Sequence, residues 1–169
     1  MMDRRVLLAS GVAAAALLLA NKSGEAGTMS TAEQAIDWRN LSDAEWRKRL
    51  TPEQYEILRK DGTEPAGSSP LLNEHRNGVF ACAGCDLPLF SSATKFESGT
   101  GWPSFYAPLP NAVETRTDRS FFMTRTEVHC RRCLGHLGHV FNDGPPPTGL
   151  RYCMDGLALK FEPAAASSS

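Results

Sequence analysis

Five cysteines carry the strongest chemical signal in this sequence. Four of them form two C-x-x-C pairs, Cys82 with Cys85 and Cys130 with Cys133. Each pair presents two thiolates from a tight turn, so two pairs in one short domain supply the four ligands of a tetrahedral zinc site. Four ligands leave no open coordination position, and we therefore predict a structural zinc that clamps two parts of the domain. Two redox dithiols or two disulfides are the alternatives.

A glycine accompanies each cysteine pair. Gly84 lies inside the first pair, and Gly135 follows the second after one residue. Glycine adopts backbone conformations that other residues avoid. We expect both glycines to let the chain turn around the metal.

The fifth cysteine, Cys153, belongs to no spacing motif. A free cysteine is ordinarily a small buried hydrophobic residue. In an exported chain, which the N-terminus indicates, an unpaired thiol is a liability unless it is reactive. Arg151 lies two residues earlier on the same face of a strand, where its charge would favour the nucleophilic thiolate. We interpret Cys153 as a nucleophile.

Two histidines, His136 and His139, can approach Cys153 from a neighbouring strand. Imidazole titrates near neutral pH, which suits an acid or base beside a nucleophile. Zinc ligation and a purely structural role are the alternatives. Asp143, four residues past His139, is expected to orient an imidazole. The remaining histidines have no such context and are predicted to lie on the surface: His75 and His129.

A glycine-containing loop, Ser98–Phe105, presents Trp102. Such a loop is costly to keep ordered unless its aromatic ring packs or binds. Trp102 would form an apolar wall for a small methyl-bearing group. A core position is the alternative.

The elements that position these residues are short. Ser42–Glu45 and Thr51–Gln54 have the pattern of capping boxes and predict two amphipathic helices, the second ending at Gly62. From Asn77 onward, segments rich in Val, Phe and Thr alternate with Gly and Pro, which is typical of antiparallel strands. The fold class is predicted to be mainly β: antiparallel sheets forming a small barrel or sandwich, with a zinc-ribbon-like four-cysteine site and short N-terminal helices. The predicted strands are Gly78–Ala81, Leu87–Phe90, Ser120–Val128, Gly138–Phe141, Tyr152–Met154 and Leu157–Phe161.

The N-terminus has the features of an export signal. Arg4 and Arg5 precede an uncharged, mostly apolar run, Val6–Ala20. A bilayer-spanning helix needs about 20 apolar residues, so a signal peptide over residues 1–26 is favoured over an anchor. The adjacent arginines resemble a twin-arginine signal and indicate export, to the periplasm in a bacterium. Export by the Sec route and an uncleaved tail are the alternatives.

Length and charge bound the rest of the chain. With 169 residues, 41% of them hydrophobic, it can bury one core. We expect a linker over 27–41, one domain over 42–163 and a disordered tail over 164–169. A net charge of −1 and the lack of a long basic run argue against nucleic acid as a partner.

Between Asp43 and Phe161 the chain resembles the B-type methionine sulfoxide reductases. The motifs that carry this resemblance are LTPEQYEILRKDGTEP, CAGCDLPLFSSATKFESGTGWPSF, CRRCLGHLGHVFNDGPPPTGLRYC and LALKF. The resemblance implies a β-rich fold, a structural zinc on the paired cysteines, and reduction of the R epimer of methionine sulfoxide in proteins. We expect a monomer whose partners are oxidised proteins and a thioredoxin-like thiol reductant.

The resemblance also implies residue roles. Cys153 corresponds to the thiol that attacks the sulfoxide sulfur, releases methionine and becomes a sulfenic acid. His136 and His139 resemble the pair that protonates the sulfoxide oxygen, and Trp102 resembles the residue that holds the substrate methyl group. The residues that resemble supporting polar groups are Asp143 and Arg151.

The chain departs from the family pattern at two positions. Many members have a resolving cysteine where this chain has Thr100, so we expect an external thiol to reduce the sulfenic acid directly. The family usually has asparagine two residues after the nucleophile, where this chain has Asp155. A carboxylate there would disfavour the thiolate unless it pairs with Arg151 or a histidine.

Two other function classes compete with this interpretation. Cys153, His139 and Asp143 could serve a cysteine hydrolase or acyl transferase, although the sequence has no evident backbone oxyanion signature. A non-catalytic zinc-ribbon interaction module would make Cys153 dispensable.

Overall fold

A computed structural model describes residues 36–120 and 123–165. The chain divides into two units, Met1–Ala35 and Ile36–Ser169, and the description below concerns the second. The export signal predicted over 1–26 lies outside the described residues, and the predicted linker and tail are described only at 36–41 and 164–165. No helix in the described ranges is long and apolar enough to cross a membrane.

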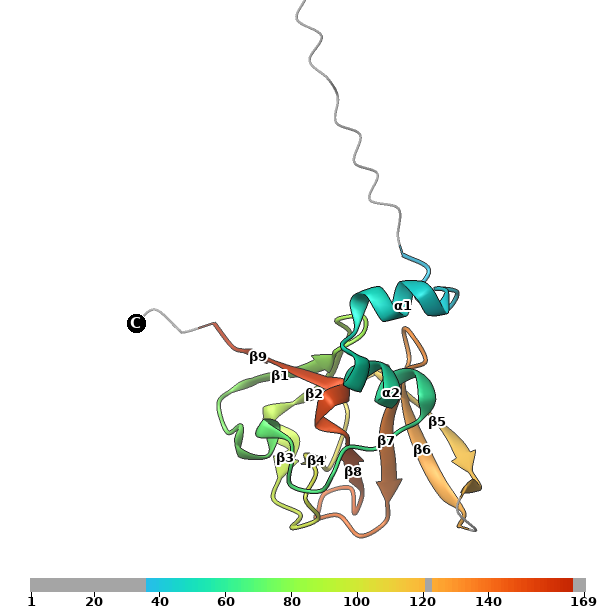
Figure 1. Cartoon of the computed structure of the whole chain (residues 1–169). Coiled ribbons are helices and arrows are strands. Elements are labelled where there is room, and N and C mark those ends of the chain that lie inside the picture. The colour runs from blue at the N-terminus through green and yellow to red at the C-terminus, as the bar shows by residue number, and fades with distance from the viewer. Residues whose placement is uncertain (1–35, 121–122, 166–169) are drawn as a thin grey trace, which may run out of the picture. The chain divides into compact units, whose positions relative to one another are not determined.

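The described strands form two antiparallel sheets (Figure 1). The three-stranded sheet has the order β2-β1-β9 and the six-stranded sheet the order β3-β4-β8-β7-β6-β5. The predicted mainly β, sandwich-like class is confirmed, and the described strands do not close into a barrel. The strands are β1 (Gly78–Cys82), β2 (Pro88–Ser91), β3 (Lys95–Phe96), β4 (Ser104–Phe105), β5 (Val113–Asp118), β6 (Arg125–Cys130), β7 (His136–Phe141), β8 (Arg151–Met154) and β9 (Leu159–Pro163).

Both predicted helices are present, α1 (Asp43–Arg49) and α2 (Pro52–Lys60), and each begins with the expected capping box. The end of α2 differs slightly from the prediction. Asp61 adopts the left-handed conformation at φ 54°, and the N–H of Gly62 donates to the carbonyl of Glu56 over 3.0 Å. Asp61 and Gly62 therefore end the helix together. Gly62 can approach the Glu56 carbonyl because it has no side chain, since a Cβ there would lie 2.9 Å from that oxygen.

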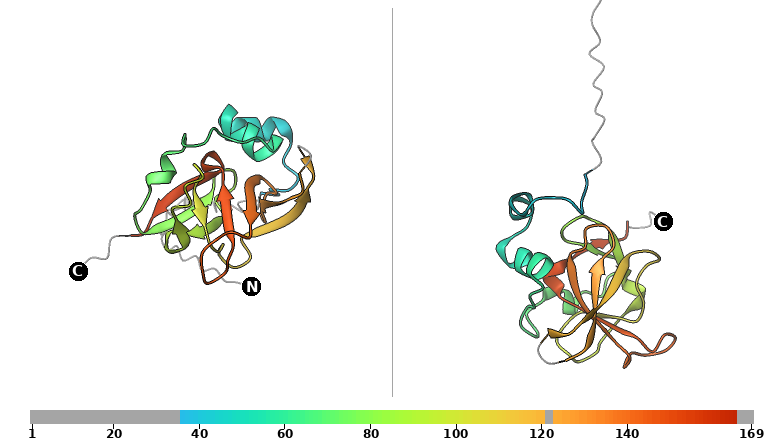
Figure 2. Two further views of the ribbon diagram at one scale, coloured as in Figure 1. Left: turned by 90° about the horizontal axis from the view of Figure 1, so that it is seen from below. Right: turned by 90° about the vertical axis from the view of Figure 1, so that its right-hand side faces the viewer.

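The core joins the helices to both sheets. Trp46, Tyr55 and Leu58 are buried on the inner faces of the helices, and α2 packs against β7 and the short 3-10 turn Gly156–Ala158. Figure 2 shows the two helices lying on one side of the sheets. This packing fixes β7 and the segment that follows β8, the two elements that frame Cys153.

An aromatic cluster fills the space where strands of the two sheets meet. Phe90 and Phe105 stack with ring centroids 4.4 Å apart, and Phe80 meets Phe105 edge-on at 5.0 Å. All three side chains are fully buried. Burial of such rings is a large hydrophobic contribution, so this cluster holds β4 in place against β1 and β2.

Several strands differ from those predicted from the sequence. The segment Ser120–Val128 is not a continuous strand, because β6 begins only at Arg125. The edge strand β5 was missed because its sequence, VETRTD, is polar and exposed over much of its length. The two-residue strands β3 and β4 give too short a pattern to detect, and Leu157 belongs to a 3-10 turn rather than to β9.

Candidate functional site

The four paired cysteines meet in one buried cluster. Their sulfur atoms all lie within 4.8 Å of one another, with Cys82 Sγ to Cys133 Sγ at 3.7 Å and Cys85 Sγ to Cys130 Sγ at 3.4 Å. Sulfurs bound tetrahedrally at a Zn–S distance of about 2.3 Å would be about 3.8 Å apart. A disulfide would need about 2 Å. The donor set therefore fits a closed, structural metal site and excludes the disulfide alternative in this structure.

The two cysteine pairs have the same local backbone structure. In each, the first cysteine accepts a hydrogen bond from the residue four positions later, and that residue has a left-handed conformation. In the first turn Asp86 has φ 60°, and in the second Leu134 has φ 59°. The prediction that Gly84 and Gly135 make these turns was wrong, because neither has a positive φ.

The glycines serve a packing role instead. A Cβ at Gly84 would lie 3.3 Å from the indole of Trp46, and a Cβ at Gly135 would lie 2.8 Å from Leu58 Cδ2. Both helices thus rest directly on the cysteine turns. One turn joins β1 to β2 and the other joins β6 to β7, so the metal site would tie the two sheets and the helices together.

Cys153 lies in the middle of β8, between two strands. It pairs with Ser104 on β4 and with His139 on β7. The close approach of β7 depends on Gly138, where φ is 143° and a Cβ would stand 2.2 Å from the carbonyl oxygen of Cys153. Only glycine fits there, and the packing sets His139 beside the thiol.

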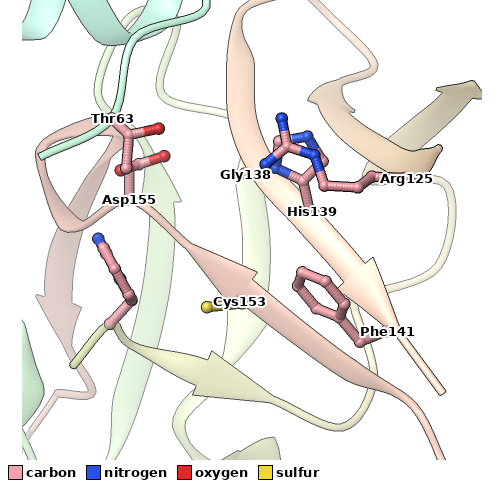
Figure 3. Close-up of a pocket in the computed structure, with 8 residues that line it drawn as sticks. Thr63, Arg125, Gly138, His139, Phe141, Cys153 and Asp155 are labelled. Atoms are coloured by element: carbon pink, nitrogen blue, oxygen red, sulfur yellow. The ribbon is translucent and has the colours of Figure 1, made fainter. Parts of the chain in front are cut away.

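The Cys153 sulfur opens into a pocket (Figure 3). In the close-up the sulfur faces the space between Asp155 and Phe141, and His139 projects from the facing strand. The lining residues are Thr63, Trp102, Arg125, Gly138, His139, Phe141, Cys153 and Asp155. The pocket thus brings together a thiol, an imidazole, a carboxyl group and two aromatic rings.

The environment of Cys153 favours the thiol at rest. Burial raises its pKa, and the nearby charge of Asp155 acts in the same direction. The hydroxyl of Thr100 and the charge of Arg151 oppose burial without overcoming it. The net effect of these groups is a pKa of Cys153 above its ordinary value.

His136 is oriented by a carboxylate on β6. Its Nδ1 lies 2.8 Å from Glu127 Oε1, and its buried Nε2 has no hydrogen-bond partner among the described residues. Burial raises the pKa of Glu127, but hydrogen bonds from Arg116 and His136 outweigh burial and keep it below its ordinary value. Glu127 is thus ionised at neutral pH, accepts the Nδ1–H and fixes the orientation of the His136 ring.

His139 has a separate carboxylate partner. Its Nε2 lies 2.8 Å from Asp118 Oδ2, at the end of β5. Hydrogen bonds from Ser120, His139 and Arg125 hold the pKa of Asp118 well below its usual range. Burial lowers the pKa of His139 despite this partner, so the ring is neutral at rest near pH 7.

Asp143 does not orient an imidazole, contrary to the sequence prediction. It forms a bidentate ion pair with Arg151, with Nε to Oδ1 at 2.9 Å and Nη2 to Oδ2 at 2.8 Å. The guanidinium also lies 4.4 Å from the ring centroid of Phe141. Asp143 therefore fixes Arg151, and Arg151 in turn adds positive charge near Cys153.

Trp102 and Asp155 are both held by the backbone of Glu64. The indole N–H of Trp102 donates to the Glu64 carbonyl over 3.1 Å, and the Glu64 N–H donates to Asp155 Oδ1 over 3.0 Å. Trp102 lines the pocket rather than the core. Asp155 Oδ2 lies 3.8 Å from His136 Nε2, and burial raises the pKa of this carboxyl group to about 6.

Of the two histidines that were predicted to lie on the surface, one is exposed and the other is buried. His75 is exposed, as expected. His129 is 8% exposed and sits beside Glu127, with Nε2 3.8 Å from Oε1. A register shift between Val128 and His129 explains the error, since a bulge moves a side chain to the other face of a strand.

Comparison with known proteins shows that the sequence is similar to one protein family. The SelR domain matches residues 50–163 of the chain. The chain is 56% identical over 125 residues to the peptide methionine sulfoxide reductase MsrB of Agrobacterium fabrum, covering 73% of this chain and 93% of the relative. It is 58% identical over 123 residues to the protein of the same name in Thiobacillus denitrificans, covering 72% and 93%.

A plant relative extends this similarity beyond bacteria. The chloroplastic peptide methionine sulfoxide reductase B1 of Arabidopsis thaliana is 56% identical over 125 residues, which are 73% of this chain and 62% of the relative. The matched region contains both cysteine pairs, the pocket and the strands that build it. The chain therefore belongs to the MsrB family of methionine sulfoxide reductases.

Proposed function

We propose that this chain reduces the R epimer of methionine sulfoxide in oxidised proteins, with Cys153 as the nucleophile. The observation that carries the proposal is the position of the Cys153 sulfur, which faces a pocket shared with His139 and Trp102. The relatives are named as peptide methionine sulfoxide reductases, and this supports the reaction class. The choice of the R epimer rests on the family resemblance.

The first step transfers one oxygen atom. The Cys153 thiolate attacks the sulfoxide sulfur while an acid protonates the sulfoxide oxygen, because oxygen is a poor leaving group without a proton. The S–O bond of the substrate breaks, methionine leaves and Cys153 becomes a sulfenic acid. In net terms a thiol and a sulfoxide become a sulfenic acid and a thioether, so the step consumes no proton.

The two imidazoles suit the proton transfers of this step. Glu127 lies 2.8 Å from a ring nitrogen of His136 and Asp118 lies 2.8 Å from a ring nitrogen of His139, so each carboxylate fixes the orientation of one ring. His139 lines the pocket of Cys153, and His136 Nε2 lies 3.8 Å from Oδ2 of Asp155, which also lines it. We assign to this pair the delivery of a proton to the sulfoxide oxygen.

The walls of the pocket offer a basis for choosing one epimer. Trp102 and Phe141 give apolar surface, whereas His139 gives a polar side. An epimer that sets its methyl group against an aromatic ring and its oxygen toward the imidazole can react. The mirror arrangement would leave the oxygen against the ring without a proton donor.

The sulfenic acid must be reduced from outside the chain. The four other cysteines lie in the buried cluster, and Thr100 occupies the place next to the Cys153 sulfur. An external thiol therefore condenses with the sulfenic acid, releasing water and forming a mixed disulfide. A second thiol then restores Cys153, and a thioredoxin-like dithiol supplies both thiols in one molecule.

Zinc is the metal we propose for the four-cysteine site. Four buried thiolates within 4.8 Å of one another match the preference of zinc for sulfur, and four ligands leave no position for a substrate. Its role here is to hold the two sheets together, and no step of the reaction passes through it.

Turnover of the two separated epimers tests the proposed function. The substrate is a blocked, peptide-like methionine sulfoxide, the reductant is dithiothreitol, and wild type is compared with Cys153→Ser. We expect wild type to consume the R epimer alone and the variant to consume neither. Consumption of the S epimer, or persistent turnover by Cys153→Ser, would refute the proposal. Mass spectrometry after one turnover without reductant should detect a sulfenic acid on Cys153 and no internal disulfide.

A further inference from the structure

A chain of three hydroxyl groups leads away from the Cys153 sulfur. Thr100 Oγ1 lies 3.7 Å from Sγ, Ser98 Oγ lies 2.9 Å from Thr100 Oγ1, and Ser104 Oγ lies 2.7 Å from Ser98 Oγ. This hydroxyl chain ends at the backbone carbonyl of Trp102, which accepts a hydrogen bond from Ser104 Oγ over 3.1 Å. Four contacts thus connect the nucleophile to a fixed acceptor.

Two elements of the backbone hold this hydroxyl chain in place. Ser104 lies on β4 directly opposite Cys153 and is buried, so its hydroxyl has little access to water. Gly99 and Gly101 flank Thr100 with φ of 72° and 95°, conformations that favour glycine. A Cβ at Gly101 would lie 2.8 Å from Ala66 Cβ. The loop therefore holds Thr100 at the sulfur.

Counting hydrogens fixes the direction of the chain when Cys153 is a thiol. Each hydroxyl and the thiol has one hydrogen, which gives four hydrogens for four contacts. The carbonyl of Trp102 can only accept, so Ser104 donates to it, Ser98 donates to Ser104 and Thr100 donates to Ser98. The thiol then donates to Thr100. Every contact is satisfied in this one arrangement.

Loss of the thiol proton changes this arrangement. Three hydrogens then remain for four contacts, so one contact must be left without a hydrogen. A hydrogen bond to an ionised acceptor is about twice as strong as one between neutral groups. The lowest-energy choice turns the Thr100 hydroxyl toward the sulfur and leaves the neutral contact at Trp102 unmet. The hydroxyl chain can therefore reverse when the thiolate forms.

The hydroxyl chain cannot carry the Cys153 proton away, because the backbone carbonyl of Trp102 at its end does not act as a base near neutral pH. Its effect on Cys153 is electrostatic and adds to that of the charged groups around it. These are Arg151 on the same strand and Asp155 after it, whereas His139 on β7 is a neutral imidazole at rest. Ser104 on β4 is a second hydrogen-bond partner of the sulfur and lowers the pKa of Cys153 less than Thr100 does. Arg151 favours the thiolate and Asp155 opposes it, so a donor at Thr100 offsets part of the cost of burying the negative charge.

We propose that Thr100 is a catalytic residue that donates a hydrogen bond to the Cys153 thiolate, and that Ser98 and Ser104 are positioning residues that reorient with it. The proposal rests on the assignment of Cys153 as the nucleophile in the proposed function. It gives Thr100 a role in generating the nucleophile, at the position where many members of the family have a resolving cysteine.

The test measures thiolate formation directly. Full-length protein loaded with zinc is alkylated with iodoacetamide across a pH series, and the tryptic peptide Tyr152–Lys160, which contains Cys153 as its sole cysteine, is quantified by mass spectrometry. Thr100→Val removes the hydroxyl with little change in shape. We expect the midpoint of its alkylation profile to rise by about one pH unit, which is about tenfold slower alkylation near pH 7. Thr100→Ser should restore the wild-type midpoint.

Two further variants serve as an independent test and as a control. Ser98→Ala interrupts the chain one step away and should raise the midpoint by a smaller amount, whereas Thr115→Val makes the same chemical change as Thr100→Val on an exposed strand and should leave it unaltered. An unchanged midpoint in folded, zinc-loaded Thr100→Val would overturn the proposal. Alkylation needs no sulfoxide, so a shifted midpoint without turnover of the R epimer would retain the hydroxyl chain and reject the proposed function.

Discussion

At the scale of single residues, the charge of Asp155 depends on pH in the range where the proposed nucleophile, Cys153, would work. Its side chain is buried, and burial raises its pKa to about 6. Below that pH the carboxyl group is neutral and has no charge to oppose a thiolate. Above it, a buried negative charge lies near Cys153 and raises the pKa of its thiol further.

Asp155→Asn should therefore increase activity above pH 7. The amide oxygen can still accept the Glu64 N–H, whereas the negative charge is gone. We expect kcat/KM for the R epimer to rise roughly three- to tenfold at pH 7.5, with little change near pH 5.5. The check is a pH–rate profile of both proteins with dithiothreitol. Coinciding profiles would mean that the Asp155 charge is compensated in the working enzyme.

The same substitution makes a stability prediction. A carboxyl group with a raised folded-state pKa stabilises the fold below its unfolded pKa of about 4, and this contribution is lost as the pH rises through about 6. Asp155→Asn should thus be more stable than wild type by roughly 2–3 kcal/mol above pH 7, and equal to it near pH 4. Urea unfolding at both pH values measures the difference. A difference that does not depend on pH would contradict this pKa.

At the scale of elements, the register between β7 and β8 places the imidazole at the thiol. Gly138 controls that register, because its φ of 143° and the 2.2 Å approach of its absent Cβ to Cys153 O exclude other residues. The same strand carries His136 and His139, so a shift of β7 would displace both imidazoles together. A residue with no reactive group thus determines the geometry of the site.

Gly138→Ala tests this constraint. We expect a loss of roughly 3 kcal/mol or more in the free energy of unfolding, together with at least a tenfold loss of activity. Gly149→Ala is the matched control, since Gly149 also has a positive φ, 71°, but a Cβ there would meet no atom within 4 Å. It should cost only about 1 kcal/mol. Equal losses in the two variants would show that backbone strain, and not the strand approach, is responsible.

At the scale of the whole molecule, the four-cysteine site joins parts that the chain order keeps separate. Its two turns come from different sheets, and both helices pack on those turns. The sheets meet elsewhere through the aromatic cluster around Phe105. The metal is therefore expected to be required for folding of the domain, whereas the proposed reaction takes place in the pocket.

Metal removal should unfold the domain. We expect one zinc per chain by elemental analysis, and loss of the cooperative thermal transition when a strong chelator removes it. Cys85→Ser should lose the metal and the folded state together. Cys153→Ser should keep both, because that side chain lies outside the cluster. A metal-free protein with an unchanged melting temperature would rule out a structural role for the metal.

Much of this architecture was accessible from the sequence, because the relevant signals are local. Capping boxes act within one helical turn, so both helices were predicted from their first residues. The two C-x-x-C pairs identify metal ligands because their spacing alone fits the geometry of a turn. By contrast, β5 was not predictable, since a polar edge strand carries little hydrophobic alternation.

The sequence by itself determined the chemistry present: a four-thiolate cluster, a fifth cysteine outside it, and two imidazoles close to one another in the chain. Only the tertiary structure decided which groups act on these residues. Glu127 and Asp118 hold the imidazoles, while Asp143 holds Arg151 instead. The physical reason is that partners across a sheet are chosen by strand register and bulges, which depend on the packing of the whole domain and not on spacing along the chain.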